Sequence, residues 1–167
     1  MATHAATRHS KAGTRSSKIN AITLLNGDHE EVAELLDRYE KRKSRMEGAQ
    51  KQDLAGEICT KLTVHAQIEE EIFYPAVAEA IEDAEGLVEE ARVEHASLKR
   101  LIGKIEKGSP DSHEYDAQVK VLGEYVKHHV KEEQNELFPM ARKSDIDLAA
   151  LGEQLMTRKS ELTEQKS

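Results

Sequence analysis

Residues 65–75 read HAQIEEEIFYP, and residues 129–139 read HVKEEQNELFP. In both stretches a histidine is followed by glutamate four residues later and by proline ten residues later. Residues four apart lie on one face of an α-helix, so each stretch presents an imidazole and a carboxylate to a common point. The two stretches therefore predict two helices that each carry a pair of metal-type side chains.

A second pair of stretches also matches, and it supplies two more histidines. DHEEVAELLDRYEK, which begins at Asp28, aligns with EHASLKRLIGKIEK, which begins at Glu94, so that His29 corresponds to His95. The offsets between the two halves are 66 (95 minus 29) and 64 (129 minus 65). Two αα-hairpins related by an approximate two-fold axis are predicted, with their metal-type residues meeting near that axis.

Apolar residues recur every three or four positions in four long segments, as in helices with one buried face. The four stripes are Ile22, Leu25, His29, Val32, Leu36 and Tyr39; Leu54, Ile58, Leu62, His65, Glu69, Ile72 and Ala76; Val88, Ala91, His95, Leu98, Ile102 and Ile105; and Val119, Leu122, Val126, His129, Glu133, Leu137 and Met140. The pattern predicts an all-α fold, an up-down-up-down four-helix bundle over residues 19–143. Pro75 and Pro139 are expected to kink their helices at equivalent places.

The two ends of the chain differ from the bundle. Residues 1–18 hold four basic and no acidic residues and no apolar core segment, which predicts a disordered basic tail and excludes a secretory signal; a transit peptide is the weaker alternative. Residues 144–167 are predicted to form a short additional C-terminal helix and tail, with Ser144 and Asp147 as a capping box at its start.

Each of the four stripes carries a histidine where packing alone would favour leucine or isoleucine. The candidate metal ligands are His29, His65, Glu69, His95, His129 and Glu133. Any one of them alone would be interpreted as a core histidine or as the edge of a solvated face. Six in phase, with repeated spacing, favour a metal site, because uncompensated buried carboxylates cost at least several kcal/mol. Two ions suit the two carboxylates, and the ligand set fits iron, manganese or zinc.

Charge and cysteine content exclude several classes of function. The net charge is −8, which leaves −12 (−8 minus 4) for residues 19–167 and argues against a nucleic-acid partner. Cys59 is the sole cysteine, so no disulfide framework exists and a cytoplasmic location is expected. No apolar run is long enough to span a membrane. A monomer or a homodimer is expected.

Taken together, DH at 28–29, HxxxE and FYP at 65–75, EH at 94–95, and HxxxE and LFP at 129–139 resemble the hemerythrin family in its HHE cation-binding branch. The resemblance covers about residues 20–142. It implies two non-haem iron ions, bridged by carboxylates and by oxide or hydroxide. It also implies dioxygen, hydrogen peroxide or nitric oxide as small-molecule partners.

One departure from the family bears on function. The oxygen-carrying members use a fifth histidine, whereas this chain has Ala91 and Lys99 at the corresponding positions. Tyr125 or His128 are less certain substitutes, and His128 also competes with its neighbour His129. A more open iron favours catalase- or peroxidase-like chemistry in oxidative-stress protection; the alternative is an iron- or oxygen-sensing or storage module without turnover. Ferritin-like bundles use Glu-x-x-His pairs instead, and a metal-free scaffold is the remaining alternative.

Overall fold

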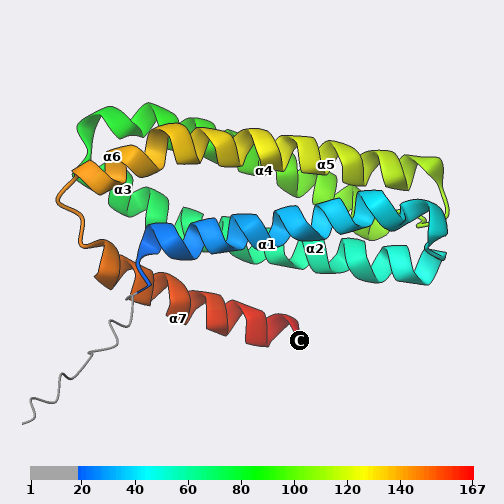
Figure 1. The fold of residues 1–167 in the computed structure, drawn as a ribbon. Helices are drawn as coiled ribbons and strands as arrows, with labels where there is room; N and C mark the ends of the chain where they lie inside the picture. Colours follow the sequence, from blue (N-terminus) through cyan, green and yellow to red (C-terminus); the bar gives the residue numbers. More distant parts are fainter. Residues whose placement is uncertain (1–18) are drawn as a thin grey trace, which may run out of the picture.

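The computed structural model describes residues 19–167, and the predicted tail at 1–18 lies outside them. Within this range every regular element is helical. The elements are α1 (Ala21–Arg42), η1 (Lys43–Arg45), α2 (Gly48–Ile68), η2 (Glu69–Phe73), α3 (Tyr74–Ala80), η3 (Glu82–Ala84), α4 (Glu85–Lys107), α5 (His113–Glu132), η4 (Glu133–Leu137), α6 (Phe138–Lys143) and α7 (Leu148–Lys166). The α2–η2–α3 and α5–η4–α6 segments are each one uninterrupted rod, so four long rods and α7 make up the fold (Figure 1).

The four rods run up, down, up and down. Helix α1 packs on α2, α2 on α4, α4 on α5, and α5 back on α1. This closed square confirms the predicted four-helix bundle. Helix α7 lies outside the square, along α1 and α2 (Figure 1). None of the helices within residues 19–167 has both the length and the apolar character that a membrane span requires.

Side-chain caps fix where the first and last helices begin. The side chain of Asn20 accepts a hydrogen bond from the Thr23 amide at 3.0 Å, so α1 begins directly after Asn20. At α7 the prediction was wrong by a few residues: Asp147 is the cap and accepts from the Ala150 amide, whereas Ser144 ends α6 by donating to the Ala141 carbonyl. Helix α7, the predicted additional C-terminal helix, runs for 19 residues.

A single π-helical turn follows each HxxxE pair. In η2 the Tyr74 amide donates to the Glu69 carbonyl, and in η4 the Phe138 amide donates to the Glu133 carbonyl, five residues back in each case. Such a turn inserts one extra residue and rotates everything after it. The prolines stand just beyond these turns, and the rods continue past them as α3 and α6.

The extra residue shifts the buried face of the helix. Phe73, Tyr74 and Val77 are fully buried, whereas Ile72 and Ala76, the residues predicted from α-helical spacing, are only partly buried. That part of the predicted stripe was therefore wrong. The third stripe, on α4, contains no π turn and is buried residue for residue as predicted.

The apolar core is divided in two. One cluster lies toward α3, α6 and α7, and includes Phe73 and Phe138; the other lies toward the opposite loops and includes Tyr39 and Tyr115. Between them lies a layer of buried polar side chains, which forms the candidate site.

Candidate metal centre

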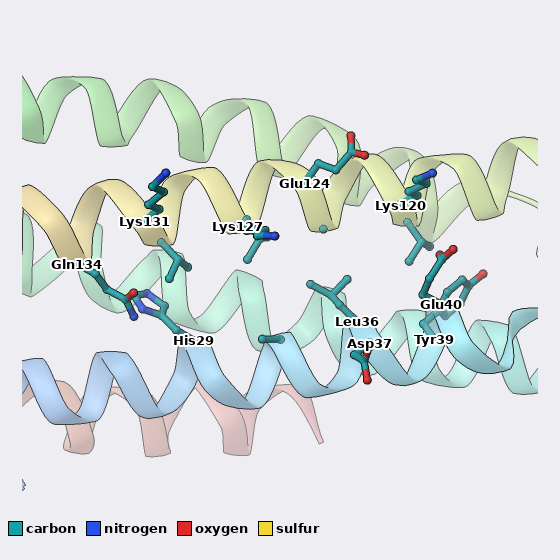
Figure 2. A pocket seen from close by; sticks show the side chains of 15 residues that line it. His29, Leu36, Asp37, Tyr39, Glu40, Lys120, Glu124, Lys127, Lys131 and Gln134 are labelled. Atoms are coloured by element: carbon teal, nitrogen blue, oxygen red, sulfur yellow. The ribbon is translucent and has the colours of Figure 1, made fainter.

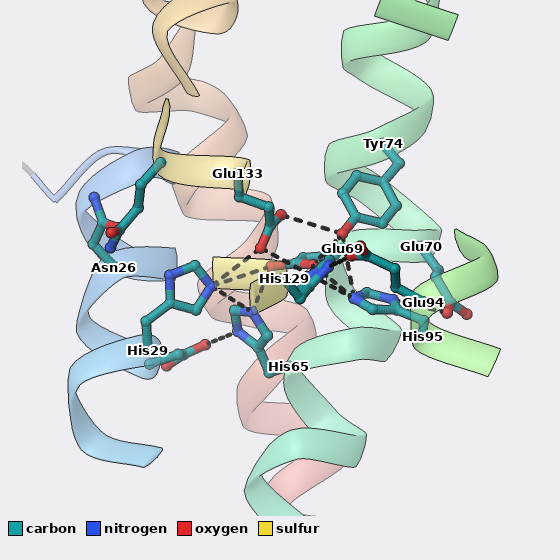
Figure 3. A network of polar contacts seen from close by, with 12 residues as sticks. Asn26, His29, His65, Glu69, Glu70, Tyr74, Glu94, His95, His129 and Glu133 are labelled. Carbon is teal, nitrogen blue, oxygen red and sulfur yellow. Dashed lines mark hydrogen bonds and ion pairs between the residues drawn. The ribbon is translucent and has the colours of Figure 1, made fainter. Parts of the chain in front are cut away.

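All six predicted ligands converge in the middle of the bundle (Figure 3). They come from separate elements: His29 from α1, His65 from α2, Glu69 from η2, His95 from α4, His129 from α5 and Glu133 from η4. Every one of them is buried, and Glu69 is completely inaccessible to solvent. The structure therefore places together the residues that the sequence singled out.

The six residues form two groups that share one carboxylate. His29, His65, Glu69 and Glu133 offer ligand atoms within 4.8 Å of one another, and so do Glu69, His95 and His129. The Nε2 atoms of His29 and His65 are 3.1 Å apart, and those of His95 and His129 are 3.0 Å apart. Two nitrogens bound at right angles to one ion, each about 2.1 Å from it, would be about 3 Å apart. The imidazole pairs thus have the spacing of two ligands on a common ion.

The carboxylates provide the test of whether cations fit this site. Oε1 of Glu69 and Oε1 of Glu133 are buried and accept no well-aligned hydrogen bond from the described residues. Only imidazole nitrogens face them: Nε2 of His65 lies against Oε1 of Glu69, and Nε2 of His29 and Nε2 of His129 lie 3.2 Å and 3.1 Å from Oε1 of Glu133. A buried carboxylate oxygen without a partner is costly, and a bound cation removes the penalty. Neutral imidazole and carboxylate together suit iron, manganese or zinc, so the residues present fit such ions.

In the protein without metal, the buried carboxylates raise the pKa values of the neighbouring histidines. Burial opposes protonation of His65, but the carboxylates of Glu69 and Asp28 outweigh it and raise the pKa of His65 to about 10. Burial likewise opposes protonation of His129, and Glu133 more than compensates, which raises the pKa of His129 to about 12. Protons on these imidazoles thus take the place of cations.

In three of the four histidines, the ring nitrogen that faces away from the centre, Nδ1, forms a hydrogen bond to a carboxylate. Nδ1 of His65 donates to Asp28 at 2.9 Å, and Nδ1 of His95 donates to Glu70 at 3.0 Å. Nδ1 of His129 donates to Glu94 at 2.5 Å. This arrangement turns Nε2 toward the centre and increases the basicity of the ring. Sequence reasoning gave these three acids no role.

Tyr74 is a further residue of the site that the sequence interpretation missed. Its hydroxyl donates to Oε2 of Glu69 at 2.6 Å and lies 3.2 Å from Oε2 of Glu133. It is also 3.2 Å from Nε2 of His95 and 3.4 Å from Nε2 of His129. Burial and the two carboxylates raise the pKa of Tyr74 well above its usual value, so the phenol stays protonated.

The less certain candidates do not reach the centre. Tyr125 is 49% exposed, and the side chain of His128 is 65% exposed and lies near Glu94 and Glu132. His129, and not His128, points into the bundle. Ala91 is buried but has no donor atom, so Tyr74 is the extra polar group that the structure brings to the six candidate ligands.

Helix α7 contacts the site through one of the supporting acids. Lys159 donates to Asp28, and Asp28 in turn accepts from His65. Arg158 pairs with Glu71 in η2 at 2.7 Å. Gly152 allows this close packing, because a Cβ there would come within 2.8 Å of the backbone at the start of α1. The equivalent acid in the other half, Glu94, pairs with His128 and His129 and with no lysine of residues 19–167.

We expect Lys159→Met to weaken metal binding at the His29 and His65 pair by about tenfold, because Asp28 loses the cation that holds it in place. Competition with a chelator would measure this loss. Lys166→Met, on the last turn of the same helix, is the matched control and should retain full affinity. Unchanged affinity in Lys159→Met would show that the lysine contact does not support His65.

Comparisons with known proteins agree with this geometry. The sequence profile of the hemerythrin HHE cation binding domain matches residues 20–141. A hemerythrin HHE cation binding domain-containing protein from Mycobacterium kansasii has the same fold, with a TM-score of 0.72 and 20% identity over 88% of this chain and 89% of that chain. A protein from Nostoc sp. (strain PCC 7120), named DNA nickase, is 30% identical over 130 residues. The match covers 78% of this chain and 36% of that protein, so the chain spans about a third of its relative's length.

Proposed function

Because the chain belongs to the hemerythrin HHE cation-binding family, we propose that it holds two iron ions at the six-residue site and reacts there with hydrogen peroxide or dioxygen, or binds nitric oxide. The observation that carries this proposal is the pair of ligand groups that share Glu69. With a carboxylate common to both groups, the two ions would lie close enough to act on one small molecule.

A small space beside the ligands suits a diatomic molecule. It has a volume of about 20 Å³ and is bounded by the ligand histidines together with Leu62, Leu98, Val126 and Val130. A cavity of this size holds about one molecule as small as water. Its apolar walls favour dioxygen, peroxide or nitric oxide over larger or charged substrates.

The proposed reaction is catalase-like. One peroxide molecule is reduced to water while a second is oxidised to dioxygen, so no external reductant is required. Bound iron would supply the exchange of electrons. The contribution of the chain is to exclude bulk water, to hold the imidazoles through their carboxylates, and to offer the Tyr74 hydroxyl as a proton donor at the centre. A protective role against oxidative stress follows from this chemistry.

The test is dioxygen release from hydrogen peroxide by the purified, iron-loaded protein. We expect many turnovers per chain with iron, and none with zinc, which has no redox chemistry. Iron-loaded protein with two ions per chain that leaves peroxide untouched would refute the catalase-like reaction. If that protein nevertheless melted well above its metal-free form, the alternative of a sensing or storage module would be favoured.

That alternative has one structural observation in its favour. Helix α7 lies outside the residues matched by the family profile, yet it contacts the site through Lys159 and Asp28. Occupancy of the site could therefore be transmitted to α7. We propose no nicking activity, because the chain spans about a third of the Nostoc protein and its net charge of −8 repels a phosphate backbone.

A further inference from the structure

One of the four histidines lacks the carboxylate that supports the others. Nδ1 of His29 is buried and has no hydrogen-bond partner among the described residues. By the internal repeat, the residue that corresponds to Glu70 is Gln134, at an offset of 64. Gln134 is neutral, and its amide donates to Asn26 at 2.9 Å. With Nε2 directed at the centre, Nδ1 of His29 is left as a donor without an acceptor.

A groove between α1 and α5 ends at this histidine. Its volume is about 700 Å³, and Figure 2 shows His29 and Gln134 together at one end and Tyr39 and Glu40 at the other. The apolar lining consists mainly of Ala33, Leu36, Val119, Gly123, Val126 and Val130. From residue 29 to residue 40 the groove follows eleven residues of helix, or roughly 16 Å. Its shape suits an elongated apolar chain.

The charge beside His29 is positive. Lys127 and Lys131 stand over the half of the groove that ends at His29 (Figure 2), and neither forms an ion pair within residues 19–167. Two acids of the opposite wall are neutralised, since Asp37 pairs with Lys41 at 2.6 Å and Glu40 pairs with Lys43 at 2.7 Å. The remaining acid of the lining, Glu124, lies beyond Lys127 toward Lys120 and away from His29 (Figure 2). In a chain of net charge −8, two free lysines over an apolar groove select an anion.

We propose that this groove binds an organic carboxylate with an unbranched apolar tail. The carboxylate accepts from Nδ1 of His29 and from Lys131, and so supplies the acid that the chain provides at the other three histidines. The tail lies along the apolar lining toward Tyr39. The exposed amide of Gln134 must swing away from Asn26 to admit the head group. The inference rests on the proposed function, because metal binding by Nε2 makes Nδ1 of His29 a donor.

Decanoate is a suitable probe, titrated calorimetrically into the iron-loaded protein. We expect saturable binding of one decanoate per chain, with decanol at least about tenfold weaker because it lacks the charge. Gln134→Glu should weaken decanoate by about tenfold or more, because the new carboxylate satisfies His29 from within the chain. Lys127→Gln with Lys131→Gln should weaken it similarly, whereas Lys104→Gln, on α4, is the control and should have no effect.

A further variant, Gly123→Met, tests the groove without changing its charges. Gly123 faces Leu36, and Gly123→Met should fill the groove and abolish decanoate binding while it improves the helix. Decanoate that fails to bind protein with two irons per chain, or that binds all variants equally, would overturn this inference and leave the proposed function intact. Protein that takes up no metal would instead refute the proposed function, and the inference with it.

Discussion

Replacing Glu69 with glutamine is expected to abolish binding of both metal ions. Glu69 belongs to both candidate ligand groups, is fully buried, and has an Oε1 atom that accepts no well-aligned hydrogen bond from the described residues and lies against Nε2 of His65. The amide has the shape of the acid but carries no negative charge, and only its carbonyl oxygen can act as a ligand, so it cannot serve two ions as the carboxylate does. The fold should survive, because the substitution removes a buried charge without leaving a cavity.

Metal content and thermal unfolding with and without iron measure this effect. The wild-type protein should gain about 4 kcal/mol at a metal concentration about 1,000 times its Kd, and Glu69→Gln should gain almost nothing. Glu133→Gln should retain about one ion, because Glu133 belongs to only one group. Glu136→Gln, exposed in the same π turn, is the control and should bind both. Two ions in Glu69→Gln would contradict the shared-ligand arrangement.

The six candidate ligands could be found in the sequence because the helices are regular up to them. From His65 to Glu69, and from His129 to Glu133, the chain follows α-helical spacing, so a four-residue step places both side chains on one face. His95 lies in a helix without a π turn, whose buried stripe matched the sequence pattern fully. A polar residue at a position where the helical repeat calls for an apolar one was therefore enough to identify each candidate ligand.

Helical periodicity could not identify the other residues of the site, which are Tyr74 and the supporting acids. After Glu69 the π turn shifts the buried face by one residue, which turns Tyr74 inward although α-helical spacing favoured Ile72. The internal repeat held a clue, since Tyr74 aligns with Phe138 and only one of the two carries a hydroxyl. The acids Asp28 and Glu94 were visible beside His29 and His95, but each supports a histidine on a neighbouring helix, and single-helix periodicity does not reveal such pairs.

The second large effect is expected from removal of the Tyr74 hydroxyl. Phe138 shows that phenylalanine fits the equivalent position of the other repeat, where it stacks on His29 with ring centroids 5.8 Å apart. Tyr74→Phe should therefore preserve the fold and the iron content. It removes the buried proton donor that lies 2.6 Å from Glu69, and peroxide turnover should fall about 100-fold, the lower range for loss of a general acid.

Dioxygen release per bound iron separates this loss of chemistry from a loss of metal. Tyr115→Phe is the matched control, because Tyr115 is equally buried but lies in the apolar cluster at the far end of the bundle. That variant should turn over peroxide like the wild type. Tyr74→Phe that retains both irons and the full rate would show that the phenol only packs, and the proton would then have to reach the centre through a histidine and its supporting carboxylate.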